Sequence, residues 1–288
     1  DAGAVERRLR VVDRLVEDAL ALGNDGGDER LLPPAVTALG IEIRVCPNWR
    51  SYKKIVPTLL DAPDAFVVTA DDDVYYPADW LEKLVAEIGE RGGVAACRAL
   101  DVTSREDTQA FVDFAEQRFG RVDVIINNAG VMPLSPLDAL KVDEWNRMID
   151  VNIRGVLHGI AAGLPLMQRQ RAGQFVNIAS IGAYAVSPTA AVYCATKFAV
   201  RGLTQAAAQE WAEHGITVNA VCPGYIDTEM VAAVPQDVRE KIIGGIPVGR
   251  LGDPAEIAEA VCWLASDKAG FNTGSVLTIN GGQYIANG

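Results

Sequence analysis

Two stretches, Phe175-Val-Asn-Ile-Ala-Ser-Ile-Gly-Ala-Tyr184 and Tyr193-Cys-Ala-Thr-Lys-Phe-Ala-Val200, decide which fold and chemistry this chain is expected to have. Residues 174–179 form a short apolar run, which predicts a buried strand. Ser180 follows directly, so its hydroxyl is expected at the end of that strand. A strand end that presents a hydroxyl group is a candidate place for chemistry.

A helix is expected after this strand and a short loop. Ser187-Pro188 offers it an N-cap residue and a first-turn proline. Tyr193 and Lys197 are four residues apart and therefore share one helical face. The lysine ammonium favours the phenolate form of the tyrosine, so the tyrosine pKa is expected to fall toward neutrality. With Ser180 holding a carbonyl oxygen beside the phenol, the three groups could move a proton on or off an alcohol while a hydride leaves or arrives.

The same residues resemble the signature of the short-chain dehydrogenase/reductase family. Its pattern is Tyr-x-x-x-Lys with a serine thirteen residues before the tyrosine, which is the spacing of Ser180 and Tyr193. The resemblance extends from about residue 81 to the C-terminus. It implies an α/β fold with a doubly wound, mostly parallel sheet, in a Rossmann-like three-layer α/β/α arrangement. The alternation of strand and helix patterns favours the same fold class.

This resemblance implies a hydride transfer between a nicotinamide cofactor, NAD or NADP, and a secondary alcohol or ketone, among them 3-oxoacyl thioesters and small ketones. Tyr193 would act as the acid/base, Lys197 would lower its pKa and hold the ribose, and Ser180 would polarise the substrate oxygen. Asn152 would complete a proton path to Lys197, because Asp150-Val-Asn-Ile-Arg-Gly155 matches the family motif around that asparagine. A side chain that only satisfies local backbone groups is the other reading of Asn152.

The resemblance also implies which residues contact the cofactor. The motif Asn127-Asn-Ala-Gly130 follows a strand, where small residues let the ribose approach the backbone. Asp101 would lie beside the adenine ring, although it also fits the start of a helix, and the segment after Pro223 would contact the nicotinamide. The implied cofactor-binding residues are Asp71, Asp101, Val102, Asn128, Ala129, Gly130, Tyr193, Lys197, Pro223, Gly224, Ile226 and Thr228.

The first eighty residues do not fit the family, and we expect two domains, 1–80 and 81–288. A Thr-Gly-x-x-x-Gly-x-Gly turn is expected here to cradle the pyrophosphate, and the sequence contains none. A strand over 65–70 nevertheless runs into Asp71, which could take the place of the acidic residue that binds the ribose 2′-hydroxyl and would favour NAD. The first βαβ unit is therefore atypical. We interpret the chain as a fusion of two unrelated segments that join near residue 80.

Residues 31–84 instead resemble a piece of a nucleotide-sugar glycosyltransferase, through the text Val67-Val-Thr-Ala-Asp-Asp-Asp-Val-Tyr-Tyr-Pro-Ala-Asp-Trp80. In that family aspartates at a strand end hold a divalent metal against a diphosphate, and Asp71, Asp72 and Asp73 have that position. Two alternatives to an active reductase therefore stay open. One is a reductase-like protein that cannot hold its cofactor, and the other is a nucleotide-sugar-binding module.

Further elements are expected at regular intervals along the rest of the chain. They are strands over 94–100, 122–126, 217–222 and 276–279, and helices over 81–90, 106–119, 142–167, 191–213 and from Asp253 onward. The residues between Thr228 and Gly249 would form a lid over the substrate. The resemblance implies a homodimer or homotetramer through the helices over 142–167 and 191–213.

Composition limits the partners. The net charge of −12 argues against nucleic acid and anionic membranes, and no apolar run reaches the length of a membrane span. Five widely spaced cysteines without a CxxC pair fit buried or free thiols in a reducing cytoplasm. The two histidines, His158 and His214, are too few for a histidine-based metal site, and we expect none.

Overall fold

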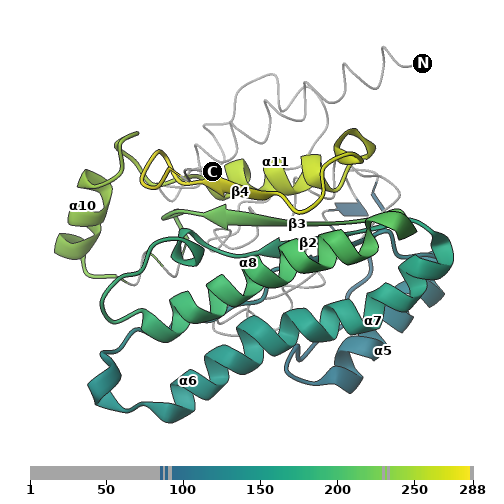
Figure 1. The fold of residues 1–288 in the computed structure, drawn as a ribbon, viewed down its shortest axis with the longest axis horizontal. Coiled ribbons are helices and arrows are strands. Elements are labelled where there is room, and N and C mark those ends of the chain that lie inside the picture. The colour runs from purple at the N-terminus through teal and green to yellow at the C-terminus, as the bar shows by residue number, and fades with distance from the viewer. Residues whose placement is uncertain (1–84, 87, 90–92, 229–230, 232–233, 286–288) are drawn as a thin grey trace. The chain divides into compact units, whose positions relative to one another are not determined.

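The computed structural model describes residues 85–285, except for 87, 90–92, 229–230 and 232–233. A four-stranded parallel sheet lies at the centre of this part of the chain (Figure 1). Its strands follow one another in chain order, with each hydrogen-bonded to the next: β1 Val124–Asn127, β2 Gly173–Ile178, β3 Ile216–Pro223 and β4 Val276–Ile279. The carboxyl ends of all four strands therefore meet at one edge.

Helices cover both faces of this sheet (Figure 1). The larger group, α5, α7 and α8, packs on one face, whereas α11 packs against β3 from the other. The helices are α5 Arg105–Phe119, α6 Val142–Ile149, α7 Gly155–Gln170, α8 Ala191–Trp211, α10 Gln236–Gly244 and α11 Pro254–Leu264. Short turns complete the set: η3 Leu137–Ala139, η4 Asp150–Arg154, η5 Ile181–Ala183, η6 Ala212–His214 and η7 Asp267–Ala269.

Alternating side chains of the strands explain the three layers. On β2, Phe175 is fully buried in the cluster under α7 and α8, while its neighbour Val176 joins the cluster under α11. On β3, Ala220 and Cys222 face the first cluster and Val221 faces the second. Strands that are apolar on both faces need cover on both sides, which a parallel sheet receives from its crossover helices. The predicted three-layer α/β/α fold class is confirmed.

Two helices begin close to where the sequence predicts them, and local signals set their ends. Ser104 caps α5 by accepting a hydrogen bond from the Asp107 amide, and Gly120 ends it in a left-handed conformation with φ 84°. At α11, Asp253 and Glu256 form a capping box, and a proline occupies the first turn. The bounds of both helices thus follow from residues at their own termini.

The start of α8 differs from the prediction. Ser187 and Pro188 do not begin the helix, which starts at Ala191 without a side-chain cap. Thr189 has a left-handed backbone, with φ 67°, and its carbonyl accepts a hydrogen bond from the Ser135 amide at 3.0 Å. A residue in that conformation cannot continue a right-handed helix, so the chain turns once more before α8 begins.

Two further predictions are corrected. The helix expected over 142–167 is interrupted by the π-helical turn η4, in which the Gly155 amide bonds to the Asp150 carbonyl five residues earlier. The strand expected over 94–100 has no strand conformation. A strand exists through its hydrogen-bond ladder, and this segment forms none with the residues that the structure describes.

Candidate active site

Ser180 lies where the sequence predicts it, immediately after β2. The Ala179 amide still bonds to the Val221 carbonyl of β3 at 2.8 Å, and the chain then leaves the sheet in the one-turn helix η5. The Ser180 hydroxyl oxygen accepts a hydrogen bond from the Gly182 amide at 3.0 Å and so caps this turn. That bond uses one lone pair of the hydroxyl, and its proton stays available as a donor.

The tyrosine and lysine of α8 face this strand end. A Cβ atom built on Gly182 would lie 3.4 Å from both the Ser180 hydroxyl oxygen and the Tyr193 ring, so the two side chains flank the same glycine. The Lys197 ammonium lies 5.6 Å from the centre of the Tyr193 ring and donates to the Ile178 carbonyl at 2.9 Å. The structure thus brings these three predicted residues together.

Asn152 joins them from the π-helical turn η4. Its side chain is buried and makes three hydrogen bonds: it accepts from the Val131 amide at 2.9 Å and donates to the Val131 carbonyl and the Thr196 hydroxyl, each at 3.0 Å. A Cβ atom on Gly130 would lie 3.3 Å from the Lys197 ammonium and 3.5 Å from the Asn152 side-chain oxygen. The bare backbone at Gly130 therefore leaves the two polar groups on either side of a small space. π-helical turns of this kind are frequent at functional sites.

The pKa of Tyr193 does not follow the prediction. Burial raises the pKa of this phenol to about 12, and its hydrogen bond with Ser180 opposes the rise without cancelling it. The thiols of Cys194 and Cys222 and the phenol of Tyr225 contribute further upward shifts. The expected pKa near neutrality, drawn from Lys197 alone, is therefore not found, because desolvation is the largest influence on this phenol.

Part of the predicted cofactor set lies beside this group. Val102, Ala129 and Tyr193 pack against one small apolar cluster formed by Val131, Met148 and Val151. A small, mainly apolar hollow adjoins it, and Val102, Asn128 and Ala129 line part of its wall. The walls come from α5, β1, η4 and α7, and the hollow runs along β1 to its carboxyl end.

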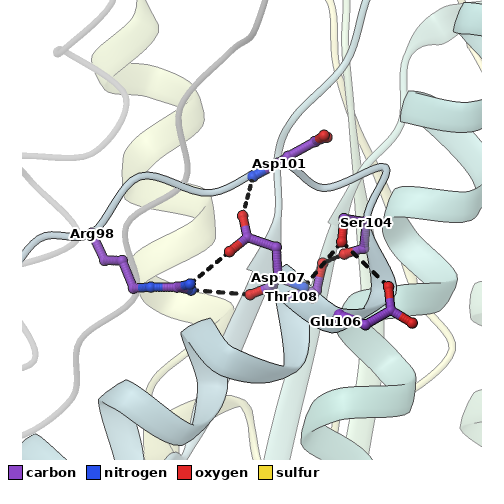
Figure 2. Close-up of polar contacts among 6 residues, drawn as sticks. All are labelled: Arg98, Asp101, Ser104, Glu106, Asp107 and Thr108. Carbon is purple, nitrogen blue, oxygen red and sulfur yellow. Dashed lines mark hydrogen bonds and ion pairs between the residues drawn. The ribbon is translucent and has the colours of Figure 1, made fainter.

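Asp101 lies in the turn before α5, and Figure 2 shows its amide donating to the Asp107 carboxylate. The Asp101 carboxylate accepts hydrogen bonds from the amide and the hydroxyl of Thr103 at 2.9 and 2.7 Å, and its own amide donates to Asp107 at 2.7 Å. Arg98 pairs with Asp107 at 2.6 Å. The Asp101 amide and Arg98 together hold the pKa of Asp107 below its usual value, against burial. Asp101 is exposed, so the turn leaves one of its carboxylate oxygens open to solvent.

The predicted nicotinamide segment follows β3. The Gly224 amide bonds to the Ile279 carbonyl at 2.8 Å, and a Cβ atom on Gly224 would lie 2.8 Å from the Asn280 backbone, so only glycine fits there. Ile226 pairs with Gly252 in an isolated parallel bridge. Pro223 is half-buried and Thr228 is buried. Since Tyr225 acts on the pKa of Tyr193, this segment and the catalytic group adjoin each other.

Sequence reasoning missed several buried polar side chains that fix this geometry. Thr196 accepts from Asn152 and donates to the Tyr193 carbonyl at 2.7 Å. Behind it, Asn177 of β2 accepts from Asn127 at 2.8 Å and donates to Thr204 of α8 at 2.9 Å. The available signal was the one that marked Asn152, a polar residue within an apolar stripe, which requires partners when buried.

Asp71 lies outside the described residues, as do Asp72 and Asp73. Among the side chains that the structure does describe, no group of three or more histidine, cysteine, aspartate or glutamate residues could hold a metal ion. Within the same part of the chain, no helix is both long and apolar enough to cross a membrane.

The arrangement of Ser180, Tyr193, Lys197 and Asn152 at the carboxyl edge of a parallel sheet defines a class of protein. The chain belongs to the short-chain dehydrogenase/reductase family, whose members are nicotinamide-dependent oxidoreductases. A model of the family described as enoyl-(acyl carrier protein) reductase matches residues 61–283.

Individual relatives support this assignment. The chain is 39% identical over 204 residues to the 3-oxoacyl-[acyl-carrier-protein] reductase of Staphylococcus aureus, covering 71% of this chain and 83% of the relative. It is 45% identical over 189 residues to the acetoacetyl-CoA reductase of Shinella zoogloeoides, covering 64% and 77%. The gluconate 5-dehydrogenase of Burkholderia cenocepacia, solved with NADP and tartrate, has a TM-score of 0.67 at 33% identity, covering 70% and 80%.

These comparisons confirm the predicted family and move its boundary. The family match begins at residue 61, whereas the sequence predicted about residue 81. It therefore overlaps the last part of the segment 31–84 that resembles a glycosyltransferase, including Asp71, Asp72 and Asp73. Those aspartates thus lie within the part of the chain that matches the reductase family.

Proposed function

We propose that this chain is a nicotinamide-dependent reductase of 3-oxoacyl thioesters or similar small ketones. The observation that carries the proposal is the convergence of Ser180, Tyr193, Lys197 and Asn152 on one strand end. Two relatives that act on 3-oxoacyl thioesters, at 39 and 45% identity, support this substrate class over a sugar alcohol.

The described residues fit two parts of a nicotinamide dinucleotide. The apolar hollow with Val102, Asn128 and Ala129 in its wall suits a flat, weakly polar ring such as adenine. The bare backbone at Gly130, beside the Lys197 ammonium, suits a ribose. The segment from Pro223 to Thr228 lies beside Tyr193 and would hold the nicotinamide end. When bound, the cofactor supplies or accepts the hydride.

The chain's own residues handle the substrate oxygen and the proton. Ser180 donates its remaining hydroxyl proton to the substrate carbonyl and holds it beside the phenol of Tyr193. Tyr193, which burial keeps protonated near neutral pH, gives its proton to the developing alkoxide. Proton transfer in this direction is favourable, because an alkoxide is far more basic than a phenolate.

Lys197 and Asn152 prepare and restore this acid. The Lys197 ammonium, 5.6 Å from the Tyr193 ring, stabilises the phenolate that remains after the proton leaves. Asn152 holds Thr196, and Thr196 holds the Tyr193 carbonyl, so the turn of α8 that carries the tyrosine is fixed from behind. The small space between Asn152 and Lys197 at Gly130 is the place for a water that returns the proton from solvent.

The N-terminal part of the proposal rests on sequence. The family match from residue 61 supports placing the predicted strand 65–70 in the slot of the second family strand, with Asp71 at the ribose 2′-hydroxyl and a preference for NAD. The division into 1–80 and 81–288, and the fusion origin of the first part, remain proposals. Because no glycine-rich turn is present, the pyrophosphate would depend on other backbone amides.

A homo-oligomer in the cytoplasm is the remaining part of the proposal. Leu157 on α7 and Phe198 on α8 are 41% and 40% exposed. Exposed apolar side chains on these two helices support an interface between copies of the chain there. Light scattering of the purified chain measures this directly, since a dimer or tetramer doubles or quadruples the mass of 30.8 kDa.

The test is a binding and turnover experiment on the full chain. Fluorescence titrations with NADH and NADPH measure affinity, and acetoacetyl-CoA reduction is followed by loss of cofactor absorbance. Micromolar binding with turnover that Tyr193→Phe abolishes supports the proposal. If neither dinucleotide binds at concentrations up to millimolar, the proposal is overturned. The chain is then a reductase-like protein that cannot hold its cofactor. A nucleotide sugar with Mn²⁺ is then the next ligand to titrate, because Asp71, Asp72 and Asp73 fit that alternative.

A further inference from the structure

One stripe of α8 continues past the catalytic pair. Tyr193, Lys197 and Arg201 follow one another at four-residue intervals and so lie along one helical face. Each of the three side chains contacts the end of β2 or the segment that follows it. Tyr193 forms a hydrogen bond with Ser180, Lys197 donates to the Ile178 carbonyl at 2.9 Å, and Arg201 donates to the Ala183 carbonyl at 2.8 Å. The first two belong to the proposed reaction, whereas the third has no assigned role.

The segment that Arg201 holds is the turn that orients Ser180. In η5 the Ser180 hydroxyl accepts from the Gly182 amide at 3.0 Å, and the Ser180 carbonyl accepts from the Ala183 amide at 2.9 Å. Ser180 is therefore the N-terminal cap of a turn whose last carbonyl, that of Ala183, is bound by a cation. A positive charge at this end complements the exposed carbonyls of a helical turn.

The guanidinium is fixed in this position by its aromatic neighbours. It lies 4.3 Å from the centre of the Tyr184 ring and 5.6 Å from that of Phe198. Tyr184 in turn stacks on Tyr284, with ring centres 5.1 Å apart and planes at 27°. A planar cation can stack on a ring and donate to a carbonyl at the same time, which a lysine ammonium cannot reproduce in the same geometry.

The C-terminal stretch completes the support. After β4, the Asn280 side chain donates to the Tyr284 carbonyl at 2.8 Å and accepts from the Gly282 amide at 3.0 Å. Gly281 and Gly282 both have left-handed backbones, with φ 60° and 82°. This tight turn places Tyr284 against Tyr184 and so connects the end of the sheet to the turn that follows Ser180.

We propose that Arg201 is a positioning residue, which holds the turn η5 so that the Ser180 hydroxyl faces Tyr193. The inference rests on the proposed reductase function for its effect on catalysis. Its effect on the turn itself is independent of that function. Arg201 does not reach the reacting atoms; it acts through the Ala183 carbonyl and the Tyr184 ring.

The experiment compares Arg201→Met, Arg201→Lys and Arg201→Ala in the full chain. Misplacing a catalytic group by a fraction of an ångström costs on the order of tenfold to a hundredfold in rate, so Arg201→Met is expected to lower kcat for acetoacetyl-CoA by about thirtyfold. Dinucleotide affinity should stay within about twofold, because Arg201 lies outside the residues expected to hold it. Arg201→Lys should stay low, while millimolar guanidinium should restore part of the kcat of Arg201→Ala.

Arg169→Met is the matched control. Arg169 is also a helix arginine that donates to a backbone carbonyl, that of Pro165 at 3.3 Å, but it lies at the far end of α7, away from Ser180. This variant should keep wild-type kcat. Unchanged kcat in Arg201→Met, or a loss that matches the loss of folded protein by circular dichroism and is not rescued by guanidinium, would overturn the inference.

Hydrogen exchange separates this inference from the proposed function. The Gly182 amide, bonded to the Ser180 hydroxyl, should exchange about tenfold faster in Arg201→Met than in wild type or Arg169→Met. If the wild-type chain reduces no ketone but this amide responds, the proposed function fails and the positioning role stands. If the chain is active and the Gly182 amide does not respond, the positioning role fails alone.

Discussion

The two ends of the proposed site are built in different ways. At the catalytic end, the contacts join residues far apart in the sequence and are buried: Asn152 reaches Val131 and Thr196, and Lys197 reaches Ile178. At the Asp101 turn, every hydrogen bond of the carboxylate closes within a few residues and is exposed to solvent. Geometry at the first end therefore depends on the whole fold, whereas the second end can form almost by itself.

This difference indicates where function is vulnerable. A buried hydrogen-bonded group that loses its partner pays the full desolvation cost, whereas an exposed group exchanges its partner for water. Substitutions at the catalytic end should therefore change rate or stability strongly. Substitutions at the Asp101 turn should change them weakly, unless the cofactor adds contacts that make this end equally sensitive.

The largest expected effect follows from removing the phenol of Tyr193. Tyr193→Phe removes the proton donor and keeps the ring, which packs beside Val131 and Met148. Loss of a positioned general acid typically costs a hundredfold to ten-thousandfold, so we expect kcat to fall by about a thousandfold. Stopped-flow or steady-state reduction of acetoacetyl-CoA measures it. If Tyr193→Phe retains turnover, another group must donate the proton to the substrate. If the variant loses dinucleotide affinity, the Tyr193 hydroxyl helps to bind the cofactor.

The pH dependence tests the raised pKa of the same phenol. With a pKa of about 12, Tyr193 stays protonated through neutral pH, so the rate of ketone reduction should be flat from about pH 7 to 9. Oxidation of the product alcohol needs the phenolate, whose fraction grows about tenfold with each pH unit below the pKa. The oxidation rate should therefore rise steadily up to about pH 10. A plateau near pH 8 would instead show that Lys197 dominates once the site is complete.

The sequence predicted the parts of this site that depend on spacing. Ser180 at a strand end and Tyr193 with Lys197 on one helical face follow from periodicity, and the structure places them accordingly. The ends of α5 and α11 were predictable for the same reason, because capping residues act over three or four positions.

The errors concern features that distant residues impose. The Tyr193 pKa depends on packing that buries the ring, and the Cys222 and Tyr225 neighbours come from the end of β3. The start of α8 is shifted by Thr189, whose carbonyl is held from Ser135 far back in the chain. Neither contact can be inferred from a local window, and the same holds for the support that Arg201 receives through Tyr184 from Tyr284.

A smaller effect, on stability, is expected at Asn152. Asn152→Ala leaves the amide and carbonyl of Val131 and the hydroxyl of Thr196 without their buried partner. Each such loss costs about 1–3 kcal/mol when water cannot enter. Because the surrounding structure can partly relax, we expect the free energy of unfolding to fall by about 3 kcal/mol in total. Urea denaturation measures it. Asn146→Ala, on the exposed surface of α6, is the control and should change stability by less than about 0.5 kcal/mol.

A loss below about 1 kcal/mol in Asn152→Ala would show that water fills the space beside Gly130. Water would then reach the catalytic end more easily than its buried hydrogen bonds indicate. The difference in solvent exposure between this end and the Asp101 turn would be smaller than proposed. The rate of ketone reduction gives a second reading of the same variant, since the Tyr193 carbonyl is held through Thr196.

The smallest effect is expected at the Asp101 turn. Asp107→Asn keeps an oxygen that can accept from the Asp101 amide but loses the ion pair with Arg98, which is about two-thirds buried. We expect a loss of about 1 kcal/mol in the free energy of unfolding at neutral pH. The pKa of Asp107 is lowered in the folded chain, so this contribution is complete above the unfolded value of 3.8 and fades as pH falls through the folded value.

Urea denaturation at several pH values therefore separates charge from shape at this turn. The difference between wild type and Asp107→Asn should be constant down to about pH 5 and shrink below pH 4. Asp113→Asn is the matched control on α5, because its side-chain oxygen can still accept the hydrogen bond from Gln109, and it should leave the free energy of unfolding nearly unchanged. Dinucleotide affinity should change less than about threefold in both variants. A larger loss of dinucleotide affinity in Asp107→Asn alone would mean that the Asp101 amide must be held in place for the cofactor to bind. Both ends of the proposed site would then depend strongly on the exact positions of their residues.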